Sequence, residues 1–310
     1  MRVFRKEIDI LPQFKNGVLT TGTFDGVHTG HQEILTRIKS LADANDGESI
    51  ILTFDPHPRL VLNPKDKSLK LINTLDEKIE LLEHYGIDNL VIAPFSLEFS
   101  KKSAASYVKD FLWEQMRPKT IAMGYNHHFG NNREGNIHLM CEMGTSLGFD
   151  VIEIEKQMVE HIAVSSTKIR NALISGEIEK ATALLGHSYT IKGMVVTGDS
   201  RGKLLGFPTA NIEITNPNKL IPGIGVYAIT TTIDHKPYLG MANIGTRPTF
   251  YGNDERIEVH LFDFDQDIYG AILTVEFVAK IREEMKFDSA EDLTLQLEKD
   301  KTLSLRLLCQ

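Results

Sequence analysis

The chain has 310 residues, of which 42% are hydrophobic and 25% charged, and its formal net charge is −8. This composition is ordinary for a globular protein of about two domains and excludes a mainly disordered chain. No apolar run approaches the roughly 18 residues of a membrane helix, no signal peptide follows the basic start MRVFRKEIDI, and no basic half or tail indicates a nucleic-acid partner.

In the first half of the chain, short apolar runs typical of buried strands alternate with amphipathic helical patterns. Strands are expected at Val18–Thr21, Ser49–Phe54, Asn89–Ala93, Thr120–Met123 and Val151–Ile154. Thr74 and Glu77 form a capping box that opens one of the helices. Strands that alternate with helices predict an α/β fold with a doubly wound parallel sheet, which binds ligands at the carboxyl ends of its strands.

After Gly186 the pattern changes to strands that are separated by Gly and Pro turns. They are expected at Ile191–Val196, Gly225–Ile233, Tyr238–Asn243, Ile257–Asp263 and Ile272–Val278. This pattern predicts a small antiparallel β-barrel, followed by one C-terminal helix that Ser289 caps. Because Gly186 is a suitable helix C-cap, we place the domain boundary there, giving domains 1–185 and 186–310.

The densest chemical signal is the run Gly22–His31, GTFDGVHTGH, which follows a predicted strand and opens a predicted helix. Glycines let the backbone approach phosphates, and a helix N-terminus attracts anions. His28 and His31 bracket Gly30, so both imidazoles can face one phosphate and donate hydrogen bonds to charge on a transferring phosphoryl group. We therefore interpret this turn as a phosphate site rather than as two structural histidines.

Two segments that follow predicted strands supply further ligand-facing features. Phe54–Pro58, FDPHP, has proline-fixed φ angles and shapes a loop at the ligand edge, unless it is a plain turn. Within Gly124–Gly130, Asn126 can bind a phosphate or a base edge and Phe129 can stack on a ring. Both segments favour a ligand at this edge of the sheet.

Hydroxyl groups gather again in Ser165–Arg170, SSTKIR, before a short helix predicted over Lys168–Ser175. Hydroxyls and N–H groups there suit the β- and γ-phosphates of ATP, with Arg170 as a charged clamp. An ordinary helix cap beside a surface arginine is the alternative.

The barrel half contains two glycine- or proline-containing loops. Gly198–Leu204 looks like a Walker A loop, but only three residues separate its glycines and a leucine follows Lys203, so we reject that motif. In the next run, the Thr209 hydroxyl and the Asn211 amide oxygen are hard ligands that suit Mg²⁺ bound to ATP phosphates. By themselves these residues could also form a common proline turn.

Together, the motifs resemble in order and spacing those of the prokaryotic bifunctional riboflavin kinase/FAD synthetase family. The HxGH run is typical of nucleotidyltransferases related to class I tRNA synthetases, and Pro208–Asn211 is similar to the PTAN motif of riboflavin kinases. Three later segments match as well: Pro222–Ala228, Asn243–Phe250 and Glu258–His260. The resemblance runs from Val18 to about Leu307 and implies a Rossmann-like FMN adenylyltransferase domain in residues 1–185 and a riboflavin kinase domain in residues 186–310.

The resemblance also implies roles for individual residues. In the first domain, His28 and His31 are catalytic. ATP and its phosphates are bound there by Gly22, Phe24, Asp25, Gly30, Ser165, Ser166, Thr167 and Arg170, and FMN by Phe54, Pro56, His57 and Asn126. In the second domain, Glu258 is the catalytic base that takes the proton of the terminal ribityl hydroxyl, although an exposed strand carboxylate is the alternative. ATP or flavin is bound there by Gly198, Gly202, Lys203, Gly206, Pro208, Thr209, Asn211 and Asn243, with Thr209 and Asn211 also holding the metal.

The implied function is phosphorylation of riboflavin to FMN and adenylylation of FMN to FAD with release of pyrophosphate, each with ATP and Mg²⁺. Two other hypotheses stay open: a first domain that modifies nicotinamide mononucleotide or another small phosphate, and a flavin- or nucleotide-binding regulator without activity. We expect only small-molecule partners (riboflavin, FMN and ATP), no nucleic acid or membrane, and a monomer or weak homo-oligomer. Cys141 and Cys309 show no metal or redox spacing, which favours the cytoplasm.

Overall fold

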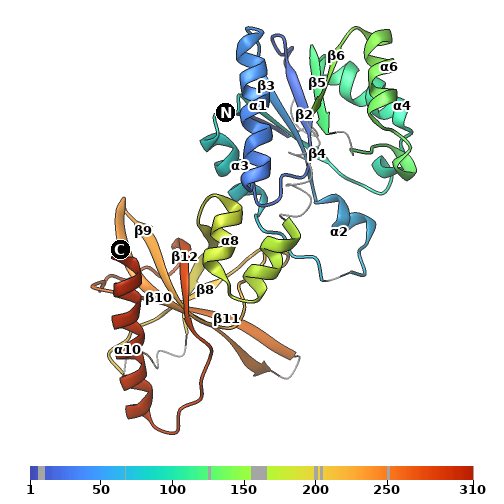
Figure 1. Ribbon diagram of the computed structural model, residues 1–310. Coiled ribbons are helices and arrows are strands. Elements are labelled where there is room, and N and C mark those ends of the chain that lie inside the picture. Colours follow the sequence, from blue (N-terminus) through green and yellow to red (C-terminus); the bar gives the residue numbers. More distant parts are fainter. Residues whose placement is uncertain are drawn as a thin grey trace. The chain divides into compact units, whose positions relative to one another are not determined.

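The computed structural model describes residues 1–5, 11–66, 68–124, 127–154, 166–198, 202, 205–249 and 252–309. The chain folds into two compact units, Met1–Thr167 and Lys168–Gln310, which are described one at a time (Figure 1). No helix within the described ranges is long and apolar enough to cross a membrane.

The first unit is built on a six-stranded sheet with the order β1-β4-β3-β2-β5-β6, and every pair of neighbours is parallel. The strands are β1 (Arg2–Arg5), β2 (Val18–Thr21), β3 (Ser49–Asp55), β4 (Asn89–Pro94), β5 (Thr120–Gly124) and β6 (Asp150–Ile154). The doubly wound sheet and its five expected strands are confirmed. Strand β1 was not predicted, because two arginines in four residues hide its strand pattern.

Helices cover both faces of this sheet (Figure 1). On one face, α1 (Thr29–Ala44) and α3 (Leu75–His84) bury Leu35, Ile38 and Leu82 against the strands. The opposite face carries α4 (Ala104–Ser106), the π-helix η2 (Tyr107–Trp113), α5 (Glu114–Met116) and α6 (Ile137–Leu147). Three short elements lie in the connections: α2 (Pro58–Leu62), η1 (Phe99–Lys101) and η3 (Asn131–Arg133).

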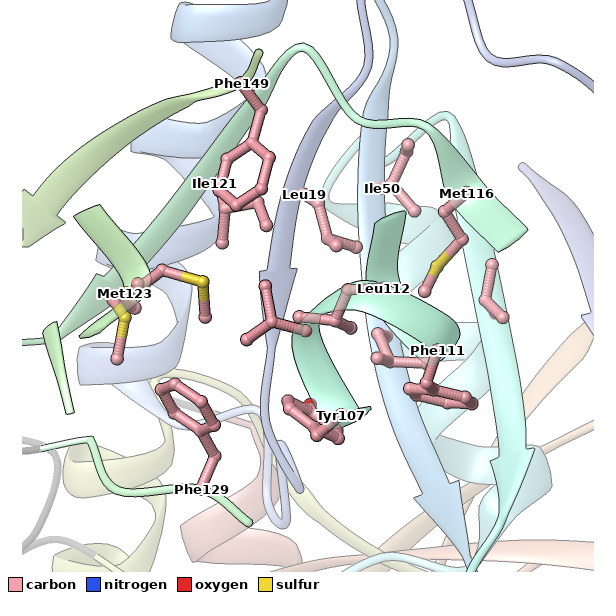
Figure 2. Close-up of a cluster of buried hydrophobic side chains, with 14 of the residues drawn as sticks. Leu19, Ile50, Tyr107, Phe111, Leu112, Met116, Ile121, Met123, Phe129 and Phe149 are labelled. Carbon is pink, nitrogen blue, oxygen red and sulfur yellow. The ribbon is translucent and has the colours of Figure 1, made fainter. Parts of the chain in front are cut away.

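The apolar core that packs under η2 extends to the edge of the sheet at which the strands end. Leu19 and Ile121 project from the strands toward Phe111 and its neighbours on η2, all of them buried (Figure 2). Tyr107, which belongs to the same cluster, lies toward the end where the strand arrows point (Figure 2). Apolar packing thus continues to the carboxyl edge, where the sequence pattern predicts a ligand site.

The second unit is a closed antiparallel barrel with the strand order β10-β11-β8-β7-β12-β9. Its strands are β7 (Tyr189–Val196), β8 (Ala210–Glu213), β9 (Gly225–Ile233), β10 (Lys236–Thr249), β11 (Gly252–Leu261) and β12 (Ile272–Arg282). The long helix α10 (Ala290–Leu308) packs beside it (Figure 1), and the Ser289 side chain accepts a hydrogen bond from the Asp292 N–H, as its cap pattern predicts. The expected barrel with a C-terminal helix is confirmed, with β8 as an additional short strand.

The compact units divide the chain 18 residues before the predicted domain boundary. A helical segment at residues 166–174 is followed by α8 (Ile178–Leu185), which ends at Gly186 in the left-handed conformation. The Gly223 N–H donates to the Leu173 carbonyl at 2.9 Å, and α8 contacts β7 and β12. Residues 168–185 therefore pack with the barrel, although their helical pattern resembles the first half of the chain.

Helix α10 is attached to the barrel by a buried ion pair. Arg282 Nε lies 3.0 Å from each carboxylate oxygen of Asp300, and Arg282 Nη2 lies 2.8 Å from Asp300 Oδ2. Gln296 Nε2 donates to Asp300 Oδ1 at 2.8 Å. The side chains of Arg282 and Asp300 are only 16% and 2% exposed. A bidentate pair of this kind fixes the helix in one orientation against the end of β12.

Replacing one member of this pair should destabilise the barrel unit. We expect Asp300→Asn to lower its free energy of unfolding by roughly 3 kcal/mol, because the Arg282 guanidinium stays buried without a counter-charge. Urea unfolding followed by circular dichroism measures this. The matched control is Glu177→Ala, which removes an exposed ion pair to Lys180 and should cost less than about 1 kcal/mol. Equal effects of the two variants would contradict the prediction.

Candidate active sites

A cavity of about 960 Å³ lies at the carboxyl edge of the parallel sheet. Strand-end residues that line it include Thr21, Gly22, Phe54, Gly124 and Ile154. One wall is aromatic, with Phe54 5.6 Å from Phe95 and 5.7 Å from Phe99 between ring centroids. Tyr107 and Phe129 continue this wall at 5.5 Å from each other. A large cavity with an aromatic wall suits a planar ring system.

His31 of the HxGH turn lines one end of this cavity, whereas His28, which the sequence predicts to face a phosphate, is fully buried and does not line it. His28 is the N-cap of α1, and its Nδ1 accepts a hydrogen bond from the His31 N–H at 3.3 Å. Because Nδ1 accepts, Nε2 carries the proton and can donate to Ser166 Oγ, 3.1 Å away. The turn after β2 and Ser166, the first residue of the helical segment 166–174, therefore meet at one imidazole.

The second histidine of the motif is held neutral by its surroundings. The His28 and His31 rings are stacked, with centroids 3.7 Å apart and planes 13° from parallel. Burial, the His28 ring and the Lys78 ammonium together hold the pKa of His31 well below its ordinary value of 6.5. His31 lines the cavity, and its Nδ1 finds no hydrogen-bond partner within the described part of the chain. A neutral imidazole there can donate its N–H to an oxygen of a bound phosphate.

The loop before α1 adopts conformations that its residue types disfavour. Phe24 and Val27 have φ angles of 46° and 38°, in the left-handed region that a β-branched residue rarely occupies. Two anchors hold the loop. Asp25 Oδ1 accepts hydrogen bonds from the backbone N–H groups of Ile72 and Asn73, and Gln32 Nε2 donates to the Val27 carbonyl. Strained backbone held by its surroundings is typical of ligand sites.

The other residues predicted for this site are distributed unevenly. Gly22, Phe24 and Phe54 line the cavity, and Gly30 is buried in the first turn of α1. Thr167 is exposed and Arg170 half-buried. Pro56 and His57 do not line the cavity: Pro56 is exposed, and His57 caps α2 by accepting from the Arg59 N–H at 3.2 Å. Asn126, Ser165 and Lys203 lie outside the described residues.

A second cavity, of about 470 Å³, lies in the barrel unit. Strand pairing places Glu258 of β11 opposite Asn211 of β8 on one side and opposite Asn243 of β10 on the other. Residues opposite each other in antiparallel strands project from the same face of the sheet. All three line the cavity, so one carboxylate lies between two amides.

Glu258 is accessible from this cavity and has a cationic neighbour. Its side chain is 35% exposed, and Arg256 Nη1 lies 3.9 Å from Glu258 Oε1. Contact of this length leaves the carboxylate free to accept a hydrogen bond from a ligand hydroxyl. Apolar side chains also line the cavity, among them Met241, Phe287, Leu293 and Leu297. The arrangement can hold an apolar ring system and present one hydroxyl to a carboxylate.

Two glycines make room for the polar residues of the loop. A Cβ atom at Gly198 would lie 2.0 Å from Asn211 Nδ2, and one at Gly202 would lie 2.3 Å from the Phe207 carbonyl oxygen. Gly202 and Thr209 also line the cavity, whereas Gly198, Gly206 and Pro208 lie outside its walls. At Gly198 and Gly202, the absence of a side chain leaves space for the Asn211 amide and for the backbone at Phe207.

The donor set of this cavity suits a cation that is shared with a phosphate ligand. Thr209, Asn211 and Glu258 offer hydroxyl, amide and carboxylate oxygens, which are the ligands that Mg²⁺ prefers. In the part of the chain that the structure describes, no three His, Cys, Asp or Glu side chains come together as a metal site. One or two protein oxygens plus substrate phosphates is the usual environment of nucleotide-bound Mg²⁺.

Sequence reasoning missed several residues of both cavities. In the first, Phe95, Phe99 and Tyr107 carry no motif and read as core positions of their segments. His127, whose pKa burial lowers to about 4, lines the same cavity. In the barrel the missed residues include His260 and Arg282. For His127 and His260, the position next to or within a motif was the available signal. Only the folded chain shows which of these side chains reach a cavity.

Comparison with known proteins finds a different family in each part of the chain. A FAD synthetase family model matches residues 11–168, and a riboflavin kinase family model matches residues 185–308. The bifunctional riboflavin kinase/FMN adenylyltransferase of Listeria monocytogenes is 37% identical over 92% of this chain and 90% of its own length. The protein of the same name from Bacillus subtilis is 36% identical, over 93% and 92%.

One solved structure resembles nearly the whole chain. It is a crystal structure named "Macrolide-efflux Protein" from Streptococcus pneumoniae, with a TM-score of 0.86 and 29% sequence identity over 98% of this chain and 99% of its own. The similarity covers both the sheet unit and the barrel unit, so the combination of these two folds in one chain is shared.

The buried neutral His31 predicts how stability depends on pH. Its folded pKa lies below the unfolded value of 6.5, so below pH 6.5 the unfolded chain gains a proton that the folded chain does not. The free energy of unfolding of the first unit should thus be highest above that pH and fall by about 1 kcal/mol between pH 7.5 and 5.5 from this residue alone.

The single tryptophan, Trp113, lies in this unit and reports its unfolding by fluorescence. Urea titrations of the wild type and of His31→Gln at both pH values measure the effect, with a smaller loss expected for the variant. An equal loss in both proteins would show that His31 is not the titrating group.

Proposed function

Because the chain belongs to the family of bifunctional riboflavin kinases/FMN adenylyltransferases, we propose that each of its two cavities carries one of the two reactions. The barrel transfers the γ-phosphate of ATP to riboflavin, and the first unit transfers the adenylyl group of a second ATP to the resulting FMN. One observation supports this division most directly: in the barrel cavity, a strand places the Glu258 carboxylate between the amides of Asn211 and Asn243.

In the first unit, the proposed chemistry is in-line attack by a phosphate oxygen of FMN on the α-phosphorus of ATP. A P–O bond forms to FMN while the bond to pyrophosphate breaks. No protein nucleophile is needed, since positioning and charge stabilisation carry such reactions. The N-terminus of α1 and the His31 imidazole supply donors at one end of the cavity, with the buried His28 ring stacked against His31, while the aromatic wall holds the flavin ring.

In the barrel, we assign Glu258 as the base that accepts the proton of the terminal ribityl hydroxyl. The hydroxyl oxygen attacks the γ-phosphorus, and ADP leaves. Asn211 and Asn243 on either side of the carboxylate orient the hydroxyl and the phosphate, and the apolar side chains of Met241, Phe287 and Leu297 receive the isoalloxazine ring. A base acts only within hydrogen-bond reach of the proton, and the cross-strand register, which fixes Glu258 between Asn211 and Asn243, supports this assignment.

Thr209 and Asn211 are proposed to hold Mg²⁺ together with ATP phosphates in the barrel. When bound, the ion neutralises charge on the transferring and leaving phosphates. The Thr209 hydroxyl and the Asn211 amide then act as orienting groups that fix the nucleotide relative to Glu258.

We further propose that the protein works on small molecules alone, in the cytoplasm, as a monomer or weak homo-oligomer. Cys141 and Cys309 are both exposed free thiols, which supports a reducing compartment. The functional boundary is proposed at residues 185–186, where the match to riboflavin kinases begins.

The two activities should be separable by mutation within one chain. Glu258→Gln removes the proposed base and should lower FMN formation from riboflavin by about 100-fold or more, while FAD formation from added FMN stays at the wild-type rate. His28→Ala should do the reverse, because it removes a donor and the cap of α1 from the first unit. Chromatography of flavins after incubation with ATP and Mg²⁺ measures both products.

Each variant serves as the control for the other. Loss of both activities in Glu258→Gln would indicate misfolding or a shared site. FMN accumulation without FAD in the wild type would leave the kinase assignment intact and require another acceptor, or reduced flavin, for the first unit.

Gly198→Ala provides a test of Asn211 that leaves Asn211 itself unchanged. The new methyl group would collide with the Asn211 amide, whose end must shift from its present position. We expect kcat/KM for FMN formation to fall about tenfold, equivalent to about 1.4 kcal/mol of transition-state stabilisation. FAD formation from FMN is the control in the same chain. Unchanged kinase kinetics would show that the position of Asn211 does not matter.

A further inference from the structure

His260 makes a hydrogen bond to the turn that precedes β8. It lies on β11, two residues after Glu258, and is 7% exposed at the edge of the barrel cavity. Its Nδ1 lies 2.7 Å from the carbonyl oxygen of Pro208. A carbonyl can only accept, so the ring carries its proton on Nδ1 and donates it to Pro208.

The backbone ladder explains why a side chain is needed at this point. The pairing of β8 with β11 consists of Asn211 opposite Glu258 and Ala210 opposite Val259. Pro208 has no N–H and cannot extend the ladder as a donor. The His260 side chain instead donates to the Pro208 carbonyl beyond the last paired residues, and so holds the turn to the strand that carries Glu258.

The ring has little freedom to leave this position. Phe207 and Phe262 pack edge-on against it, with centroids 5.2 Å and 5.6 Å away. Burial, supported by the Lys301 ammonium, lowers the pKa of His260 and keeps the ring neutral, while the bond to Pro208 opposes that shift. The imidazole is thus a fixed neutral donor rather than a group that exchanges protons with solvent.

From this geometry we infer that His260 is a positioning residue of the kinase site, which sets the place of Thr209 and Asn211 relative to Glu258 through its bond to Pro208. The inference rests on the proposed assignment of Thr209 and Asn211 to ATP. The bond lies between the turn that would bind the nucleotide and the strand that carries the base, so its loss should affect ATP more than riboflavin.

Two variants of the full-length protein differ only in the donor. In His260→Asn the amide Nδ2 occupies the place of Nδ1 and can still donate. The leucine in His260→Leu is close in shape to that asparagine but has no donor. We expect His260→Leu to raise KM for ATP in FMN formation by about tenfold, the fold-change of one lost buried hydrogen bond. His260→Asn should restore most of the ATP affinity, and KM for riboflavin should stay unchanged in both.

Two controls accompany these variants: Thr209→Ala tests the proposed nucleotide site itself, and FAD formation from FMN tests whether the first unit is intact. If Thr209→Ala keeps normal ATP kinetics, the proposed nucleotide site itself is wrong. If Thr209→Ala is impaired but the Leu and Asn variants have equal KM values for ATP, only the positioning role of His260 is overturned. Unchanged FAD formation in every variant shows that the first unit is intact.

Nuclear magnetic resonance on the wild-type protein covers the case in which a variant does not fold. With ¹⁵N-labelled histidine, the Nδ1–H resonance of His260 should shift when a non-hydrolysable ATP analogue and Mg²⁺ are added. Absence of any shift at saturation would overturn the inference.

Discussion

The register of β11 is the constraint on which the barrel site depends. Because β8 and β10 pair with β11 at the same residue, Glu258 has an amide neighbour on each side. A shift of one residue in either pairing would turn the carboxylate or its neighbour to the opposite face of the sheet. Closure of the barrel makes such a shift difficult, since every strand is fixed by two partners. The position of the proposed base is thus a property of the whole barrel and not of a flexible loop.

The first unit reaches its site by a different route. Its polar residues lie on turns after the strands, and the loop before α1 is held in a strained conformation by anchors from other segments. Asp25, which the resemblance places among the ATP-binding residues, accepts two backbone hydrogen bonds from residues 72 and 73. Its buried carboxylate thereby ties the loop before α1 to the segment that precedes α3, and so holds the loop in place.

Much of this could be predicted because the signals are local. Hydrophobic periodicity located five strands of the sheet, and Thr74 and Ser289 cap the helices that their patterns predict. The HxGH and PTAN runs are contiguous, so their residues were found without a fold. The pairing of Arg282 with Asp300 and the bond from His260 to Pro208 join residues that are 18 and 52 positions apart. No local pattern encodes such contacts, and the helix-face charge of Asp300 reads as solvated although it is buried. Likewise, His57 stands in a family motif, yet its side chain caps α2 instead of facing the cavity.

The strand that the sequence analysis missed has a consequence for how the protein behaves at high concentration. An open parallel sheet has two unpaired edges, and an edge strand is a template to which a strand of another molecule can add. Here one edge is β1, which is only four residues long and carries a guanidinium group at each end, at Arg2 and Arg5. Joining two such edges would bury these charged side chains, Arg2 together with its ion-pair partner Glu48, which opposes aggregation through this side of the sheet. The charged residues that conceal the strand pattern of β1 are thus the same ones that oppose pairing of this edge with a strand of another molecule.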